Sequence, residues 1–236
     1  MSFSNARLVR ALTLAASACL AFGASPADNP LQAVFERMDQ TSATFKGMTA
    51  DIRRITHEGI LNEDDPPDTG TVAVKLSKPH GVQMLYDFKA PDPKTVEISG
   101  TRISIYYPKA AEVQEMNLGK ARRAQMEQFL KLAFGSTSHD LQEAYTVEYG
   151  GREKIDGQDT TRLELTPKSA DVRQQFSKFE LWISDKLGIA VQQKMYQPGG
   201  TYNVMTYSNV QLNPNLAESA VKLNLPKGVK HTILSR

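Results

Sequence analysis

The stretch from Gly70 to Tyr107 constrains the fold of this chain more than any other. It contains four short runs rich in Val, Ile, Thr, Tyr and Phe, and turn residues separate these runs at 78–81, 90–93 and 99–100. This spacing is typical of an antiparallel meander, in which consecutive strands pair through tight turns. The run Val82–Phe88 carries most of its apolar side chains on one alternating face. We therefore expect a strongly curved sheet with an apolar concave face.

Amphipathic helices are predicted on either side of this meander. Asn29 can cap and Pro30 can open a helix that runs to about Thr41, with apolar residues at i, i+3, i+4 and i+7. A second helix is predicted over 120–134, and Gly135 is its stop signal. Each helix would therefore present an apolar stripe to a neighbouring layer. The stripes are Leu31, Val34, Phe35 and Met38 in the first helix and Met126, Phe129, Leu130, Ala133 and Phe134 in the second.

The rest of the chain predicts further strands. They are expected at 45–56, 112–117, 145–150, 160–167, 176–184, 189–197, 201–212 and 221–225. With the meander this gives about eleven strands and two helices, a mainly β (α+β) fold whose turn spacing fits a barrel or half-barrel. No linker or shift of composition divides residues 28–236, so we expect a single domain there.

The first 27 residues predict a cleaved Sec signal peptide. Arg7 and Arg10 form a positive n-region, and the apolar run Ala11–Phe22 is too short to span a bilayer. Small residues at 25–27 offer a cleavage site, and those at 21–23 offer a second one. We therefore expect the chain to be exported.

The single cysteine, Cys19, lies within this leader. The exported chain would then have no thiol for a disulfide, a metal site or a nucleophile. Lipidation of Cys19 is the alternative, but Ala16 stands where a lipobox usually has Leu, so we favour soluble export over a lipid anchor. Removing the leader lowers the formal charge from +2 to about zero. A neutral protein gives no electrostatic reason to expect binding to nucleic acid or to an anionic membrane.

The sequence motifs do not indicate catalysis. His57, His80, His139 and His231 are scattered, and none has a second ligand at metal-binding spacing. The sequence contains no nucleophile elbow, P-loop or dinucleotide fingerprint. We therefore expect no catalytic residue, no metal and no cofactor.

Two groups of carboxylates need a separate interpretation. The acidic stretch His57–Thr69 matches no EF-hand, so we expect a solvated loop rather than a calcium site. Glu164 and Glu180 could pair across strands as catalytic carboxylates. Strand alternation instead favours their pointing to solvent, away from the Leu and Phe side chains beside them.

The excess of apolar side chains on the expected sheet leaves two interpretations open. A curved sheet covered by amphipathic helices can enclose a cavity for an oily ligand, or its interior can be a filled core. Periodicity does not separate the two. The methionines slightly favour the cavity, because flexible thioethers suit variable apolar partners. These residues are Met48, Met84, Met116, Met126, Met195 and Met205.

Several short motifs, taken in order, carry a resemblance to a known family. After a helix and a long strand come Gly70–Pro79 (GTVAVKLSKP), an aromatic-rich strand ending near Pro91, and Val96–Tyr107 with its Ser-Gly turn. The second half adds Leu163–Ala170, Phe179–Ile183, Gly188, Tyr207–Asn213 and Val221–Val229. In this order and over nearly all of the chain after the leader, the sequence resembles the periplasmic outer-membrane lipoprotein carrier (LolA-type) family.

The resemblance implies an unclosed, strongly curved antiparallel half-barrel with helices forming a lid. Its cavity would hold the acyl chains of lipid-modified proteins. The carrier takes these in the periplasm from an inner-membrane release complex and passes them to an outer-membrane receptor, without catalysis and, we expect, as a monomer. Lys78 stands where the best-studied members have an arginine that hydrogen-bonds the lid closed. Lysine keeps the charge but loses the planar fork, so lid control is where this chain departs from the family.

We predict a cavity lined by strand residues and covered by the helices, although a one-residue error in register would reverse the inward face. The predicted cavity residues are Met48, Ile52, Val74, Met84, Tyr86, Ile103, Ile105, Leu163, Leu165, Phe179, Leu181 and Ile183, and the lid residues are Phe35, Met38, Lys78, Phe129 and Phe134. Two other functions compete with this one. The first is an envelope lipid-binding or stress-sensing module of the same fold without lipoprotein transfer. The second is a secreted hydrolase, which would need His57, His80 or His139 to cluster with carboxylates.

Overall fold

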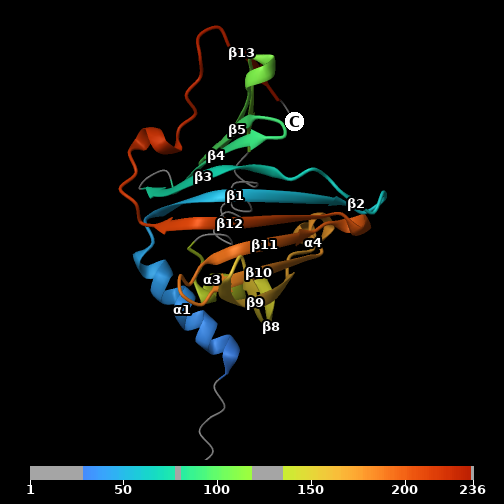
Figure 1. Cartoon of the computed structure of the whole chain (residues 1–236). Helices are drawn as coiled ribbons and strands as arrows, with labels where there is room; N and C mark the ends of the chain where they lie inside the picture. The colour runs from blue at the N-terminus through green and yellow to red at the C-terminus, as the bar shows by residue number, and fades with distance from the viewer. Residues whose placement is uncertain (1–28, 78–80, 119–134, 235–236) are drawn as a thin grey trace, which may run out of the picture.

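The structure, a computed structural model, describes residues 29–77, 81–118 and 135–234. One large curved sheet dominates it (Figure 1). The strands in the described ranges are β1 (Gly47–Glu58), β2 (Glu63–Asp64), β3 (Asp68–Ser77), β4 (Gly81–Ala90), β5 (Lys94–Ser99), β6 (Arg102–Tyr107), β7 (Glu112–Asn117), β8 (Tyr145–Ile155), β9 (Gln158–Pro167), β10 (Lys178–Ser184), β11 (Ala190–Tyr196), β12 (Tyr202–Leu212) and β13 (Lys230–Ile233).

The strand order shows an unclosed sheet made of two meanders. The first meander contains β1 and β3–β7, and the second contains β8–β12. The order is β13-β7-β6-β5-β4-β3-β1-β12-β11-β10-β9-β8, and β2 pairs with β1 off this path. β1 pairs with β12 from Met48–Leu212 to His57–Tyr202, and this ladder joins the two meanders. Among these strands all pairings are antiparallel except that of β13 with β7. The predicted unclosed antiparallel half-barrel is thus confirmed, with thirteen strands in the described ranges instead of about eleven.

The described α-helices lie on one side of this sheet. α1 (Pro30–Thr44) begins as predicted, because the Asn29 side chain accepts a hydrogen bond from the Leu31 N–H at 3.1 Å. It continues to Thr44, about one turn beyond the predicted end. Two short helices, α3 (Ser138–Ala144) and α4 (Ala170–Gln175), were not predicted, because six or seven residues give too little periodicity. The predicted helix at 120–134 and the predicted leader at 1–27 lie outside the described residues.

The segment after β12 differs from the prediction. The predicted strand at 221–225 is wrong: Val221 ends the 3-10 helix η3 (Glu218–Val221), and β13 follows only at Lys230. The alternation Val-Lys-Leu-Asn-Leu is typical of a strand, so the local pattern was misleading. In the structure the segment around Val221 and Leu223 crosses the side of the first meander that faces away from α1. The Leu223 N–H donates to the buried Glu97 Oε2 at 2.9 Å, and Val221 is fully buried.

Two clusters of buried apolar residues lie along the sheet. One is formed mainly by β1, β3 and β4, and the other by α1, α3 and β8–β11. The second cluster shows that α1 covers the second meander (Figure 1). Within the described ranges, no helix combines the length and the apolar character that crossing a bilayer requires.

Candidate functional site

One face of the sheet carries all twelve residues that the sequence predicted for the cavity. Residues that oppose each other across strands project to the same side, so the register decides this. In the first meander Met48 opposes Val74, which opposes Met84, and Ile98 and Ile103 follow. We call this side the apolar face.

The apolar face continues through the second meander. Across the join, Arg54 of β1 opposes Met205, Met205 opposes Gln193, and Gln193 opposes Leu181. Leu181 in turn opposes Leu163. The alternation of side chains therefore places the predicted residues of β9 and β10 on the same side as those of β1, β3, β4 and β6. The register adds residues that the sequence analysis did not single out, although period-two spacing from Val74 and Met84 would have found most of them: Val72, Phe88, Val96, Ile98 and Tyr207.

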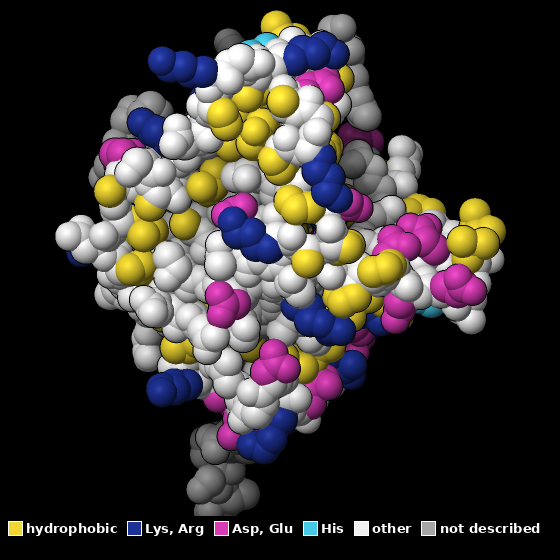
Figure 2. All heavy atoms as spheres, turned by 45° about the horizontal axis from the view of Figure 1, so that its top comes forward, with side chains coloured by type: hydrophobic (Ala, Val, Ile, Leu, Met, Phe, Trp, Pro, Cys, Tyr) yellow, Lys and Arg dark blue, Asp and Glu magenta, His cyan; other side chains and the backbone are white. Residues whose placement is uncertain are grey.

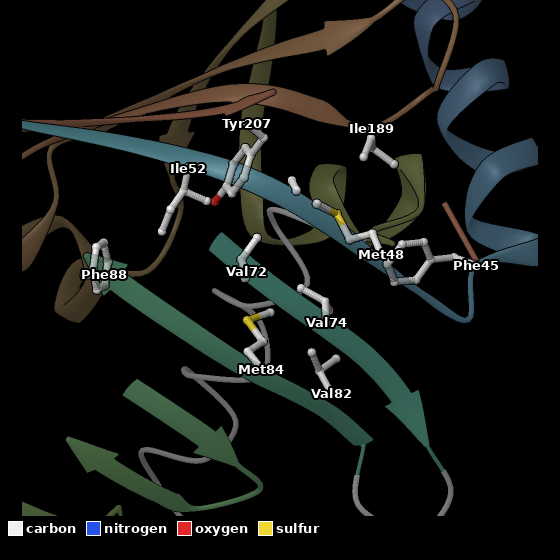
Figure 3. Close-up of a cluster of buried hydrophobic side chains, with 11 residues drawn as sticks. Phe45, Met48, Ile52, Val72, Val74, Val82, Met84, Phe88, Ile189 and Tyr207 are labelled. Carbon is white, nitrogen blue, oxygen red and sulfur yellow. The ribbon is translucent and has the colours of Figure 1, made fainter. Parts of the chain in front are cut away.

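The first meander supplies a tightly buried part of this face. Figure 3 shows side chains of β1, β3 and β4 directed toward one another. Met48, Val74 and Met84 have no exposed surface, and Ile52 is 3% exposed. Toward the sheet edge Ile103 and Ile105 are only half-buried. The apolar face thus becomes more accessible from β4 toward β6.

The apolar face contains a small cluster of polar side chains, formed by Tyr86, Tyr207 and Gln193. The Tyr207 hydroxyl accepts a hydrogen bond from Gln193 Nε2 at 3.4 Å, and the Tyr86 hydroxyl lies 3.7 Å from Met84 Sδ. Desolvation raises the pKa of Tyr86 to about 12 and that of Tyr207 well above 10. Both phenols are therefore neutral at physiological pH. Neutral hydroxyls and an amide can hydrogen-bond an ester or amide group without bringing charge into the apolar face.

α1 closes the second meander through apolar contacts. Val34, Phe35 and Met38 are 0%, 6% and 4% exposed, and they pack in one cluster with Leu163 and Phe179. The described residues leave a cavity of about 10 Å³ between Met38 and the β10–β11 segment. That volume holds about one water molecule, so this part of the face is filled by α1 itself.

Polar contacts hold α1 in this position. Arg37 Nη2 donates to Asp185 Oδ1 at 3.0 Å and to Thr161 Oγ1 at 3.3 Å. The Thr41 hydroxyl donates to the Leu187 carbonyl at 2.9 Å. Gly188 permits this approach, because a Cβ there would lie 2.4 Å from Thr41 Oγ1. Two of the predicted lid residues, Phe35 and Met38, thus belong to a helix that polar contacts fasten to the sheet, whereas Lys78, Phe129 and Phe134 lie outside the described residues.

Charged side chains border the apolar face at the end of β4. Phe88 lies under two cations: Arg54 Cζ is 4.9 Å and Lys94 Nζ is 5.3 Å from its ring centroid. Both cations also contact Asp68, in the case of Lys94 at 3.7 Å. A surface hollow of about 470 Å³, lined in part by Lys94, Tyr107 and Gln114, lies beyond this border. The apolar face therefore ends in a polar, open region.

The histidines named in the hydrolase hypothesis are not gathered at this face. His57 Nδ1 lies 2.8 Å from Asp64 Oδ1, and its ring stacks on Tyr202. His139 lies in α3, and His80 lies outside the described residues. The described part of the chain contains no group of three His, Cys, Asp or Glu residues that could hold a metal ion.

The prediction that Glu164 and Glu180 point to solvent is only partly right. Glu164 and Glu180 do lie on the side opposite the leucines and directly oppose each other, but Glu180 is 5% exposed instead of solvated. The reason is a cover of side chains: Lys178 Nζ lies 2.6 Å from Glu164 and 2.9 Å from Glu180, and the Tyr196 hydroxyl donates to Glu180 at 2.8 Å. Desolvation raises the pKa of Glu180, but these hydrogen bonds and charges outweigh it and hold the pKa below its ordinary value. An ionised, paired glutamate is not a general acid.

Comparisons with known proteins agree with this geometry. A protein-family model described as "-like: Uncharacterized protein" matches residues 89–224, more than half of the chain. The outer-membrane lipoprotein carrier protein of Cupriavidus pinatubonensis (strain JMP 134 / LMG 1197) is 27% identical over 213 residues. That alignment covers 90% of this chain and 94% of the relative.

Solved structures share the fold. An uncharacterized conserved protein from Thermus thermophilus has a TM-score of 0.53 at 11% identity, with 87% of this chain and 99% of that chain covered. MucB has a TM-score of 0.51 at 12% identity, with 85% of this chain covered. The present chain spans only 65% of the MucB chain. At these identities the likeness concerns the architecture of the sheet.

Proposed function

The chain belongs to the LolA-like family, and from this premise we propose that it is a periplasmic carrier of lipid-modified proteins. The apolar face would hold the acyl chains while the protein part of the cargo stays in water. The carrier would receive its cargo from an inner-membrane release complex and deliver it to an outer-membrane receptor. In this proposal residues 1–27 direct export, and residues 28–236 act as one domain and as a monomer.

The observation that supports this proposal most strongly is the single-sided apolar face. It runs without a change of side from β6 to β9, and it carries all twelve predicted residues. Each methylene moved from water into such a surface contributes about 0.8 kcal/mol. A C16 acyl chain, with roughly fifteen methylenes, therefore gains up to about 12 kcal/mol.

α1 is the element that an acyl chain would have to displace. Its three buried apolar side chains, Val34, Phe35 and Met38, are together worth about 5–9 kcal/mol on the apolar face. One fully buried long acyl chain, at up to about 12 kcal/mol, already exceeds this value, and two or three chains exceed it further. We therefore propose that cargo replaces α1 on the second meander, so that α1 acts as the lid.

Release of lipoproteins from spheroplasts tests the carrier function. The exported protein is added to spheroplasts, and the supernatant is examined by native mass spectrometry. A soluble complex with one triacylated lipoprotein is the expected result, and the same incubation without the protein should release none. Absence of a soluble complex in both incubations contradicts the carrier function.

The same measurement separates the competing function of this fold. If the protein is a lipid-binding or stress-sensing module, the protein recovered from the incubation should carry free lipid or no ligand on its apolar face. The polar group of Tyr86, Tyr207 and Gln193 is compatible with either ligand, because ester groups occur in lipoprotein anchors and in phospholipids alike. The mass of the bound species therefore decides between them.

A further inference from the structure

The β1–β2 hairpin carries two of the three most exposed large apolar side chains of the described residues. Its turn spans Gly59 to Asn62, and Ile60 and Leu61 at the turn are 93% and 69% exposed. We call these two residues the apolar tip. The hairpin projects from the body of the molecule at the β2 end (Figure 1). Single exposed apolar residues are ordinary, but two adjacent ones at the end of a projection form a surface that a partner can bury.

The apolar tip is held in one conformation. His57 opposes Asp64 and Glu58 opposes Glu63 in the ladder, and the Asn62 N–H closes the turn on the Glu58 carbonyl at 2.7 Å. Below the turn, the His57 ring stacks on Tyr202 at 4.5 Å.

A second contact fixes the base of the turn. Gly59 packs so closely on the neighbouring turn that a Cβ there would lie 2.3 Å from the Gly199 carbonyl oxygen. The Gly59 N–H also donates to Thr201 Oγ1 at 3.2 Å. A preorganised projection loses little conformational freedom when it binds. These contacts therefore hold Ile60 and Leu61 in an exposed position at the end of the hairpin.

Carboxylates surround the apolar tip. Glu63, Asp64 and Asp65 are exposed beside it, and Glu58 is half-buried at its base. We call these four residues the acidic collar. Figure 2 shows acidic side chains gathered next to apolar ones on this projection. Within the described part of the chain no cation pairs with Glu63 or Asp65, so their charges remain available to a partner.

The acidic collar decides what kind of surface the tip can enter. An anionic bilayer would repel four carboxylates brought to its surface together with two apolar side chains. A protein pocket that is apolar in its centre and has Lys or Arg at its rim would attract the collar and bury the tip. Charge complementarity therefore favours a protein partner over a lipid surface.

We propose that the β1–β2 hairpin docks by its apolar tip into an apolar pocket with a basic rim on a membrane-bound partner protein. This inference rests on the proposed carrier function, because it gives the carrier the contact through which cargo passes to or from a membrane. Docking through two side chains and a charged rim is short-lived, and it becomes weaker as salt screens the collar.

Binding to membranes tests the docking. The fluorescently labelled protein is mixed with three preparations from the bacterium that encodes it: native envelope vesicles, the same vesicles after protease treatment, and liposomes of their extracted lipids. We expect the protein to bind native vesicles and not to bind the liposomes. Protease treatment of the vesicles should weaken binding at least about tenfold. Raising the salt from about 50 to about 300 mM should weaken binding severalfold. Equal binding to liposomes and native vesicles, or no binding to native vesicles, overturns the proposal.

Variants assign the binding to the hairpin. Ile60→Ser/Leu61→Ser should weaken binding to native vesicles at least about tenfold, and Glu63→Lys/Asp65→Lys should weaken it and abolish its salt dependence. The matched control is Ile233→Ser, which removes an isoleucine that is 78% exposed in β13 and should leave binding unchanged. If the tip variant binds as the wild type does, the proposal is wrong.

Acyl binding separates this inference from the carrier function. All variants are titrated with a palmitoylated peptide in the absence of membranes. Normal acyl binding together with lost docking supports the hairpin as a separate docking element. If the wild-type protein does not bind the palmitoylated peptide, the carrier function is refuted. The vesicle experiment would still decide whether the hairpin docks.

Discussion

Removing the polar contacts of α1 should strengthen acyl binding. The double variant Arg37→Ala/Thr41→Val removes the contacts with Asp185 and with the Leu187 carbonyl, and it changes no residue of the apolar face. The Arg37 pair is a third exposed, so we assign it about 1 kcal/mol, and the neutral hydrogen bond contributes about 1 kcal/mol. If α1 competes with the ligand, the closed state loses about 2 kcal/mol and the open fraction rises about 30-fold.

The assay combines ligand titration with hydrogen exchange. Fluorescence anisotropy of a palmitoylated peptide should show a dissociation constant lower by about 30-fold, and the amides of α1 should exchange faster in the free protein. Lys75→Ala is the matched control, because it removes the contacts with the Leu216 carbonyl and Glu218 on the opposite face of the sheet. It should leave affinity unchanged. Faster exchange in α1 without any gain in affinity would refute the view that α1 is a lid.

Three further outcomes are expected. Ile105→Asp, on the half-buried part of the apolar face, should weaken acyl binding at least about tenfold in the anisotropy titration, whereas Tyr106→Asp on the other face should not. Gly188→Ala should cost about 2–4 kcal/mol in chemical denaturation, because its φ is +66° and its Cβ would strike α1; Gly157→Ala, with φ +79° in open space, should cost about 1 kcal/mol. The buried glutamate of β10 has a lowered pKa, so its contribution to folding is present above its ordinary value of 4.5 and is lost as pH falls below it. Lys178→Gln should therefore lower the unfolding free energy at neutral pH, and its difference from the wild type should shrink as the pH falls below that ordinary value; a difference independent of pH would contradict this.

The sequence predicted the sheet because the alternation of its strands is locally determined. Met84, Tyr86 and Phe88 repeat every second residue, and Pro and Gly mark the turns around them, so each strand could be placed without its neighbours. The twelve predicted residues fall on one face because apolar side chains recur at every second position of each strand and the ladder register joins these positions across the sheet. Their role in holding acyl chains stays a prediction.

Contacts between distant residues could not be predicted in this way. Arg37 and Asp185 are 148 positions apart, and nothing in the local pattern of either residue indicates the pair. The burial of Glu180 depends on Lys178 and on Tyr196 of the next strand, whose relative positions come from the register of β10 and β11. β13 was missed because four residues carry too little periodicity, and its partner strand lies over a hundred positions earlier.

The position of β13 has a consequence for how the protein behaves at high concentration. An open sheet leaves a row of backbone amides and carbonyls at its border, and any other extended chain can bond to that row. Here the border of β7 is already occupied by the chain's own β13, a strand of four residues that begins with Lys230 and His231. So short a border strand gives a second molecule little to extend. Pairing between copies from edge to edge would therefore have to begin at the other end of the sheet, where the eleven-residue β8 is the border strand.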